Sequence, residues 1–210
     1  MKASWDLIVD ERRSLLDTFE TLTPEQWETQ SLCSSWTVRQ LLGHLVVAAD
    51  PGLRNFVGPV LRARGSFDTA NDRLAREEAE RPVDELLARY RERHTNRKPP
   101  PGLPLTAPLG DAMLHGLDLR VPLGLPLERP VERWEPVMGL LLSFRATAGF
   151  VKRGRPKVRW VATDHDWTAG SGDAVLGTMA DLGAAASGRG ARVEHLEGPG
   201  QPAVARWLRT

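Results

Sequence analysis

Apolar residues recur with a helical period in the first part of the chain. Between residues 4 and 22 they return about every 3.6 positions, which predicts an amphipathic helix. The segment Thr23-Pro24-Glu25-Gln26 combines a cap, a first-turn proline and a capping-box glutamine, so a short second helix is expected. Thr37 and Gln40 repeat the capping-box pattern, and they open the helix that carries His44.

Further helical segments follow, separated by breakers. Asp50-Pro51 interrupts the third helix, which is expected to continue toward Arg64. The polar stretch 65–81 has weak periodicity, so we expect a mobile segment there, and helical character returns over 83–94. Five prolines between residues 96 and 108 predict an extended loop.

The next predicted helix begins at the end of this loop and carries two side chains that can take part in chemistry. Pro108 suits the first turn of a helix that bears Asp111 and His115 and ends at Pro122-Leu123-Gly124. Another apolar helix is expected over residues 131–151.

The pattern changes after residue 154. Residues 158–163 alternate like a strand, and 167–169 can pair with them across a tight turn. Residues 174–187 read as a helix rich in small side chains, and 192–196 as a last strand. The expected fold is therefore mainly α, with a four-helix-bundle domain over 1–153 and a small α+β C-terminal domain over 154–210.

Composition excludes several classes of protein. A net charge of +1, with scattered basic residues, provides no strong field for nucleic acid or acidic lipid. The single cysteine, Cys33, excludes an internal disulfide and a cysteine-based zinc site, as is usual in a reducing cytoplasm. No secretion signal is evident, and the longest apolar region, 137–144, is too short to span a bilayer. We expect a cytoplasmic protein that binds neither nucleic acid nor membranes.

Three side chains form a candidate metal site. Asp111 and His115 are four residues apart, so on a helix they lie on one face about 6 Å from each other. His44 lies in an otherwise apolar helical stretch, where a buried imidazole needs a partner or a ligand. Two histidines and one carboxylate leave a divalent ion an open position. The simpler readings are a solvated polar pair for Asp111 and His115, and a hydrogen-bonded core histidine for His44.

These motifs together resemble a known family. The chain is similar to the mycothiol-dependent maleylpyruvate isomerase family, which belongs to the DinB-like metal-binding bundles. The resemblance rests on residues 31–39, 43–45, 111–120 and 122–124, and on 163–168, 170–172 and 188–189 in the C-terminal part.

The resemblance implies an up-down four-helix bundle that binds one divalent metal, usually zinc. Its metal ligands correspond to His44, Asp111 and His115 of this chain. The characterised isomerase has Glu where this chain has Asp111, one methylene shorter, which leaves the metal and its distances open. The implied chemistry uses mycothiol, a low-molecular-weight thiol, as co-substrate with an electrophilic small molecule.

Neighbouring residues have open roles. Asp118, three residues beyond His115, is expected to orient that histidine, to act as a fourth ligand, or to pair with an arginine. Cys33 is either a reactive thiol before a helix N-terminus or a small buried hydrophobe beside Trp36. Trp36 and Trp27 are candidates to line a pocket.

The remaining histidines carry weaker signals. His94, His165 and His195 are expected to be exposed, and the acidic neighbours of His165 suggest a turn rather than a second metal site.

Three functions are compatible with these patterns. The first is a thiol-dependent metalloenzyme, an isomerase or a thiol transferase, in which the metal ionises the thiol. The second is a non-catalytic metal-binding module, which a fourth protein ligand would favour. The third is a bundle without metal, which requires His44 to point away from Asp111 and His115.

Overall fold

The computed structural model describes residues 1–50, 67–99, 102–147 and 151–209, and all structural statements concern these residues. The chain divides into two compact units, one over Ala3–Leu125 and the other over Pro126–Thr210 together with Met1–Lys2. The division between residues 125 and 126 lies earlier in the chain than the expected domain boundary at 153/154. That boundary stays a prediction, because a compact unit need not fold independently.

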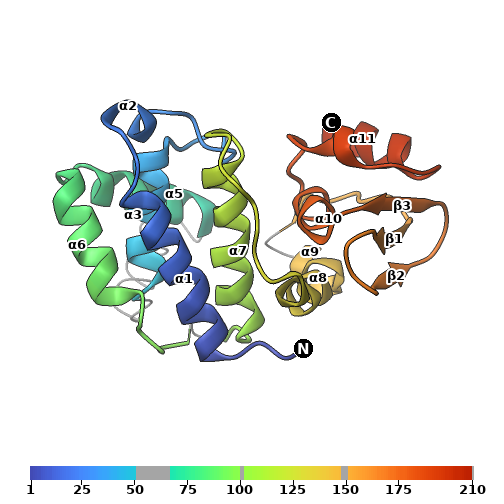
Figure 1. The fold of residues 1–210 in the computed structure, drawn as a ribbon, viewed down its shortest axis with the longest axis horizontal. Coiled ribbons are helices and arrows are strands. Elements are labelled where there is room, and N and C mark those ends of the chain that lie inside the picture. Colours follow the sequence, from blue (N-terminus) through green and yellow to red (C-terminus); the bar gives the residue numbers. More distant parts are fainter. Residues whose placement is uncertain (51–66, 100–101, 148–150, 210) are drawn as a thin grey trace. The chain divides into compact units, whose positions relative to one another are not determined.

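The N-terminal unit is helical. Its helices are α1 (Trp5–Phe19), α2 (Pro24–Trp27), α3 (Val38–Ala48), α5 (Phe67–Ala79), α6 (Val83–Arg93) and α7 (Thr106–Arg120). Helices α1 and α3 each pack against both α6 and α7, so these four form the bundle, and α5 lies along α3 (Figure 1).

Local sequence signals explain several helix starts. The Ser4 hydroxyl accepts a hydrogen bond from the backbone N–H of Leu7 at 3.3 Å and caps α1. The predicted capping box of Thr37 and Gln40 is present at the start of α3. These caps fix where α1 and α3 begin, and the apolar faces of these helices then fill a core that includes Leu15, Phe19 and Leu41.

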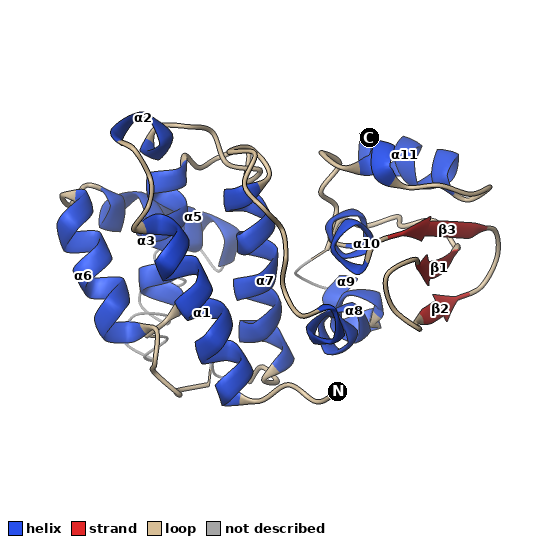
Figure 2. Cartoon of the chain, in the orientation of Figure 1, coloured by secondary structure: helices blue, strands red, loops and turns tan. Residues whose placement is uncertain are grey.

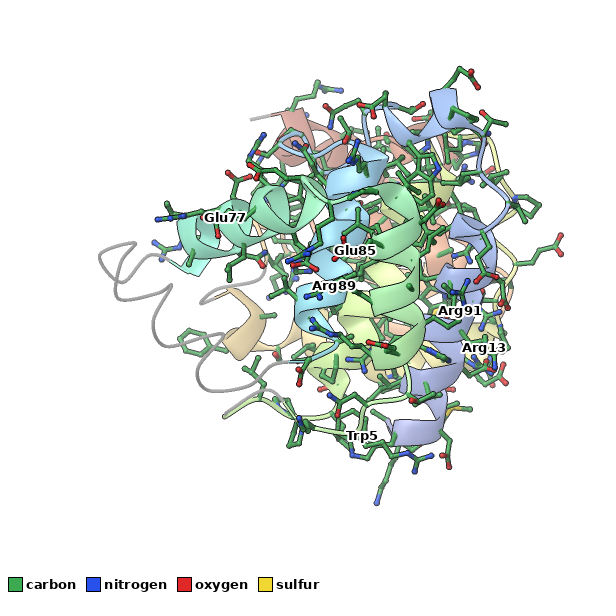
Figure 3. All side chains as sticks on the ribbon, turned by 90° about the vertical axis from the view of Figure 1, so that its left-hand side faces the viewer. Trp5, Arg13, Glu77, Glu85, Arg89 and Arg91 are labelled. Atoms are coloured by element: carbon green, nitrogen blue, oxygen red, sulfur yellow. The ribbon has the colours of Figure 1, made fainter. Side chains whose placement is uncertain are left out.

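Helix α5 lies within the stretch 65–81, where no regular element was expected, and it covers residues 67–79. Its polar side chains satisfy one another by i,i+4 ion pairs, with Arg73 and Glu77 2.5 Å apart and Arg76 and Asp72 3.1 Å apart. Figure 3 shows Glu77 projecting from this helix away from the bundle. A helix with so polar a surface gives only a weak apolar period. The continuation of the third helix toward Arg64 lies outside the described residues.

The C-terminal unit holds a three-stranded mixed sheet, the strands shown in red in Figure 2. Strand β1 (Arg159–Ala162) pairs antiparallel with β2 (Thr168–Gly170) and parallel with β3 (Ala174–Gly177), giving the order β2-β1-β3. The predicted pairing of 158–163 with 167–169 is thereby confirmed.

Three expectations for this part of the chain are wrong in detail, and one helix was not expected. Residues 174–177 form β3 and not the start of a helix, because Thr178 caps α10 (Met179–Ala186) at this point. The segment Val193–His195 is a 3₁₀ turn and not a strand. The expected helix over 131–151 is a 3₁₀ turn (Val131–Arg133), then α8 (Trp134–Leu142), and α9 (Phe144–Thr147) after a break at Ser143. Helix α11 (Gln201–Arg209) was not anticipated.

The overall prediction of a mainly helical protein with a small C-terminal α+β part is confirmed. Among the described helices, none combines the length and the hydropathy needed to cross a membrane.

Close packing of α3 against α5 depends on Gly43. A Cβ atom at this position would lie 2.4 Å from the carbonyl oxygen of Ala75 and 3.1 Å from the amide nitrogen of Ala79. Both neighbours are backbone atoms, so the helices must separate to accept a side chain. Because His44 is the next residue, the same contact fixes how deeply that histidine lies against α5.

We therefore expect Gly43→Ala to lower the free energy of unfolding by about 1–3 kcal/mol, the usual cost of overpacking. The matched control is Gly139→Ala on α8, where a Cβ meets nothing within 4 Å. There the substitution should stabilise the helix by roughly 0.5–1 kcal/mol. Thermal unfolding followed by circular dichroism measures both, and equal behaviour of the two variants would contradict the close-packing argument.

Candidate metal centre

His44 is held in the bundle by three neighbours. Its ring is 6% exposed and stacks on Trp36, with the ring centroids 4.9 Å apart and the planes at 22°. Its Nδ1 lies 2.9 Å from Oδ1 of Asn71 on α5. An imidazole Nδ1–H that donates to this amide oxygen leaves the lone pair of Nε2 available on the opposite edge of the ring.

Asp111 and His115 meet His44 from α7. Oδ1 of Asp111 lies 3.3 Å from Nε2 of His44 and 3.4 Å from Nε2 of His115. The two imidazole rings have centroids 4.7 Å apart. The spacing of four residues along α7 therefore produces the juxtaposition that the sequence predicts, and α3 brings the third group to it.

Asp118 orients the His115 ring through a hydrogen bond at the Nδ1 edge. Oδ2 of Asp118 lies 2.8 Å from Nδ1 of His115, and the aspartate is fully buried. A carboxylate at this distance retains the proton on Nδ1, so that Nε2 becomes the basic nitrogen and faces Asp111. Of the three roles open for Asp118, the structure shows this one, and the ring separates Asp118 from the Nε2 edge where a fourth ligand would be needed.

Three donor atoms thus gather at one point. One ligand atom each from His44, Asp111 and His115 lies within 4.8 Å of the other two. Two imidazole nitrogens and one carboxylate oxygen suit a divalent ion of borderline softness such as zinc. The Asp111 side chain is 33% exposed while the histidines are nearly buried, so this donor set is open on the side of Asp111. The residues present therefore fit the metal that the family resemblance implies.

A second group of potential ligands shares His115. Sγ of Cys33 donates to Oδ2 of Asp118 at 3.1 Å and lies 3.9 Å from Nδ1 of His115. Cys33, His115 and Asp118 could also hold an ion, which would bind Nδ1 instead of Nε2. Cys33 is therefore neither an isolated thiol nor a purely apolar core residue, because its S–H is engaged by the carboxylate that orients His115.

The charges of this cluster act on one another. Burial raises the pKa of Asp111, but the charges of His115 and His44 and their hydrogen bonds outweigh it and hold that pKa well below 3.8. Burial lowers the pKa of His115, yet the charge of Asp111, followed by hydrogen bonds with Asp111, Asp118 and Cys33, raises it well above 6.5. Without a metal, the Asp111–His115 ion pair is intact between these two pKa values. Acid removes it by protonating Asp111, and alkali removes it by deprotonating His115.

Sequence reasoning missed the contribution of α5. Asn71 contacts His44, and Oδ1 of Asp72 accepts a hydrogen bond from the Trp36 indole N–H at 2.9 Å. The segment 65–81 shows no strong apolar period, so nothing in its sequence pointed to the site. Trp36 lies against both histidine rings, whereas Trp27 stacks on Phe19 in the hydrophobic core, away from these rings.

The other histidines differ from one another. His195 is exposed, but His94 is only 6% exposed, so the expectation of an exposed His94 is wrong. His165 pairs with Glu135 at 2.7 Å, and the neighbouring Asp164 accepts a hydrogen bond from the backbone N–H of Met179. Asp164 therefore helps to start α10, in agreement with the turn interpretation.

Comparisons with known proteins agree with the fold. Residues 8–98 match the model of the mycothiol maleylpyruvate isomerase N-terminal domain family. Two solved structures of the mycothiol-dependent maleylpyruvate isomerase, one of them a mutant in which a histidine is replaced by alanine, resemble the chain with a TM-score of 0.62. Each is 14% identical, and the match covers 93% of this chain and 91% of the other. The search of curated proteins found no match.

The coupling between Asp111 and His115 is directly testable by titration. In the metal-free protein, Asp111→Asn removes the charge that raises the pKa of His115, while the burial that lowers it remains. The pKa of His115 should therefore fall, while the hydrogen bonds with Asp118 and Cys33 continue to raise it. NMR titration of the imidazole Cε1 proton measures the change. Asp173→Asn, the same chemical change at an exposed position, should leave the His115 titration where it was.

Proposed function

Residues 8–98 belong to the mycothiol maleylpyruvate isomerase N-terminal domain family, and on that premise we propose that this chain is a thiol-dependent metalloenzyme. Its metal ligands are His44, Asp111 and His115. The single observation that carries the proposal is the meeting of both imidazole Nε2 atoms at one oxygen of Asp111, at 3.3 and 3.4 Å.

Each ligand has a partner that prepares it for a metal. Asn71 retains the proton on Nδ1 of His44, and Asp118 retains the proton on Nδ1 of His115, so both Nε2 lone pairs are directed to the same point. Asp111 supplies a negative charge, and its low pKa keeps it ionised at neutral pH. Trp36 limits the motion of the His44 ring by stacking on it. The protein therefore holds the donor set in position before an ion arrives.

A divalent ion bound by three protein ligands has an open position, where a low-molecular-weight thiol such as mycothiol would ionise and become nucleophilic. The one-third exposure of Asp111 provides the side from which thiol and substrate approach. The solved relative is mycothiol-dependent and acts as a maleylpyruvate isomerase, which makes isomerisation of a small electrophile the first reaction to test here. A thiol transfer uses the same metal-held thiolate.

The alternative function is a non-catalytic metal-binding module. It would be favoured by a fourth protein ligand on the Nε2 side of the site. Asp118 instead lies at the Nδ1 edge of His115, and this placement supports the open site of an enzyme. The metal-free bundle is disfavoured, since it requires His44 to point away from Asp111 and His115.

Metal content tests the ligand assignment. Protein purified without chelator or polyhistidine tag should carry about one equivalent of zinc or another divalent ion. His44→Ala/His115→Ala should lose it. Cys33→Ser and the exposed His195→Ala should retain it, because neither residue contributes to the proposed ligand set.

Two results would contradict this assignment. Wild-type protein that takes up no ion even when zinc is supplied has no metal site, and both metal hypotheses fail. Loss of the ion in Cys33→Ser, with retention in His44→Ala, would place it instead among Cys33, His115 and Asp118.

Activity tests the thiol chemistry separately. Zinc-loaded protein with mycothiol should accelerate the isomerisation of maleylpyruvate, followed by absorbance. Asp118→Asn should weaken metal binding by about 10–100-fold, because the proton on Nδ1 of His115 loses its carboxylate acceptor. Added zinc should then restore part of its activity. Metal-loaded wild type that does not turn over any thiol–electrophile pair would leave the non-catalytic module as the function.

A further inference from the structure

The loop before α3 holds the only cysteine of the chain against α7. The backbone N–H of Leu32 donates to the backbone oxygen of Asp118 at 3.2 Å and ties the loop to this helix. The backbone oxygen of Cys33 accepts hydrogen bonds from the Trp36 N–H at 2.9 Å and from Nε2 of Gln30 at 2.7 Å. These bonds fix the loop at and beside Cys33, so the thiol has a defined place next to α7.

Three potential ligand atoms of different chemistry meet at this place. Sγ of Cys33 lies 3.1 Å from Oδ2 of Asp118 and 3.9 Å from Nδ1 of His115, and Oδ2 and Nδ1 lie 2.8 Å apart. An ion with bonds of about 2.0–2.3 Å holds tetrahedral ligand atoms roughly 3.3–3.6 Å from one another. The observed separations lie on both sides of this range, so small side-chain rotations suffice to admit an ion.

This group of atoms is separate from the candidate metal centre, although the two share one ring. The candidate centre uses Nε2 of His115, which lies 3.4 Å from Oδ1 of Asp111, whereas Cys33 and Asp118 lie at the Nδ1 edge. The ligand sets also differ, because Cys33 adds a thiolate to one imidazole and one carboxylate, and His44 takes no part. Thiolate ligands favour soft ions, while two imidazoles and a carboxylate suit borderline ones.

We propose that Cys33, Asp118 and Nδ1 of His115 form a second metal site, selective for a thiophilic ion such as cadmium(II) or copper(I). Binding replaces the proton of the thiol and the proton on Nδ1, and both protons leave to solvent. Sγ then binds as a thiolate, Nδ1 through its lone pair and Asp118 through a carboxylate oxygen. Cys33 is partly exposed and Asp118 is fully buried, so the ion enters on the side of the thiol.

The second site acts on the first through the shared ring. When an ion occupies Nδ1, the neutral His115 ring keeps its proton on Nε2, which faces Oδ1 of Asp111 at 3.4 Å. Nε2 is then no longer a metal ligand, so occupation of either site disfavours occupation of the other. This competition rests on the proposed function, whereas the second site itself does not.

The test is cadmium binding to the metal-free full chain, followed by the ultraviolet charge-transfer absorption of a thiolate–cadmium bond. Because Cys33 is the only cysteine, this band reports on no other residue of the chain. In the wild type the band should saturate at about one equivalent of cadmium. His44→Ala lacks the proposed metal centre and should keep both the band and the affinity, which separates failure of this proposal from failure of the proposed function.

Asp118→Asn and His115→Ala distinguish a three-ligand site from a lone thiol. Each removes one ligand and leaves Cys33 in place, so the cadmium affinity measured from the band should fall by at least about tenfold. The exposed Asp173→Asn and His195→Ala are the matched controls and should bind cadmium like the wild type. Wild-type protein unfolded in denaturant gives a second comparison that needs no variant, because unfolding separates the three ligands and should weaken binding as well.

Either of two results overturns the proposal. One is folded wild-type protein that shows no thiolate–cadmium band when cadmium is in excess. The other is a band with the same affinity in the wild type, in Asp118→Asn, in His115→Ala and in the unfolded chain, which would mean that the thiol binds cadmium alone. If the zinc content of Cys33→Ser is normal in either case, the proposed metal centre stands while the second site is rejected.

Discussion

The requirement that buried polar groups be hydrogen-bonded governs the N-terminal unit. His44 and Asp118 lie in the interior of a helical bundle, where an unpaired imidazole or carboxylate would destabilise the fold. Each finds its partner on another helix or on the next turn of its own helix. Asn71 on α5 accepts from His44, and Asp118 accepts from His115. The His44–Asn71 bond therefore adds a polar contact to the packing of α3 on α5, and the Asp118–His115 bond fixes the orientation of a side chain within α7.

Because of these partners, the two nitrogen atoms of each imidazole have different surroundings. The Nδ1 edges are engaged by an amide oxygen and a buried carboxylate, and the Nε2 edges both face Asp111. The same carboxylate of Asp118 also accepts the S–H of Cys33. The thiol is thus linked to the proposed metal centre through His115, although it lies on the far side of that ring. An ion on the Nε2 edge and an ion on the Nδ1 edge would be bound by different protein ligands. The two ligand sets differ in softness, so they would favour different ions.

The shorter acidic side chain does not prevent the cluster from forming. The family resemblance implies Glu at the position of Asp111, and one methylene less shortens the reach from α7. Oδ1 of Asp111 nevertheless lies within 3.4 Å of Nε2 in both histidines. The close approach of α3 to α5 at Gly43 helps to place His44, and the packing of α3 on α7 brings it within reach of Asp111.

The sequence by itself determined the features that depend on neighbours along the chain. The capping box of Thr37 and Gln40 depends on local hydrogen bonds, and the alignment of Asp111 with His115 depends on the helical repeat. The first β-pairing, between 158–163 and 167–169, likewise follows from a short connection. The association of His44 with Asp111 and His115, by contrast, does not follow from spacing along the chain and rests on the family resemblance.

Only the tertiary structure decided the rest, because it depends on contacts between distant segments. Asn71 lies on a helix whose polar sequence carries no apolar period, and its role arises from the packing of α5 on α3. Strand β3 forms at the start of a segment that was expected to be helical, because pairing with β1 supplies the backbone hydrogen bonds. Tyr90 looks like an ordinary member of an amphipathic helix, and only the tertiary structure shows that its buried hydroxyl has no hydrogen-bond partner among the described residues.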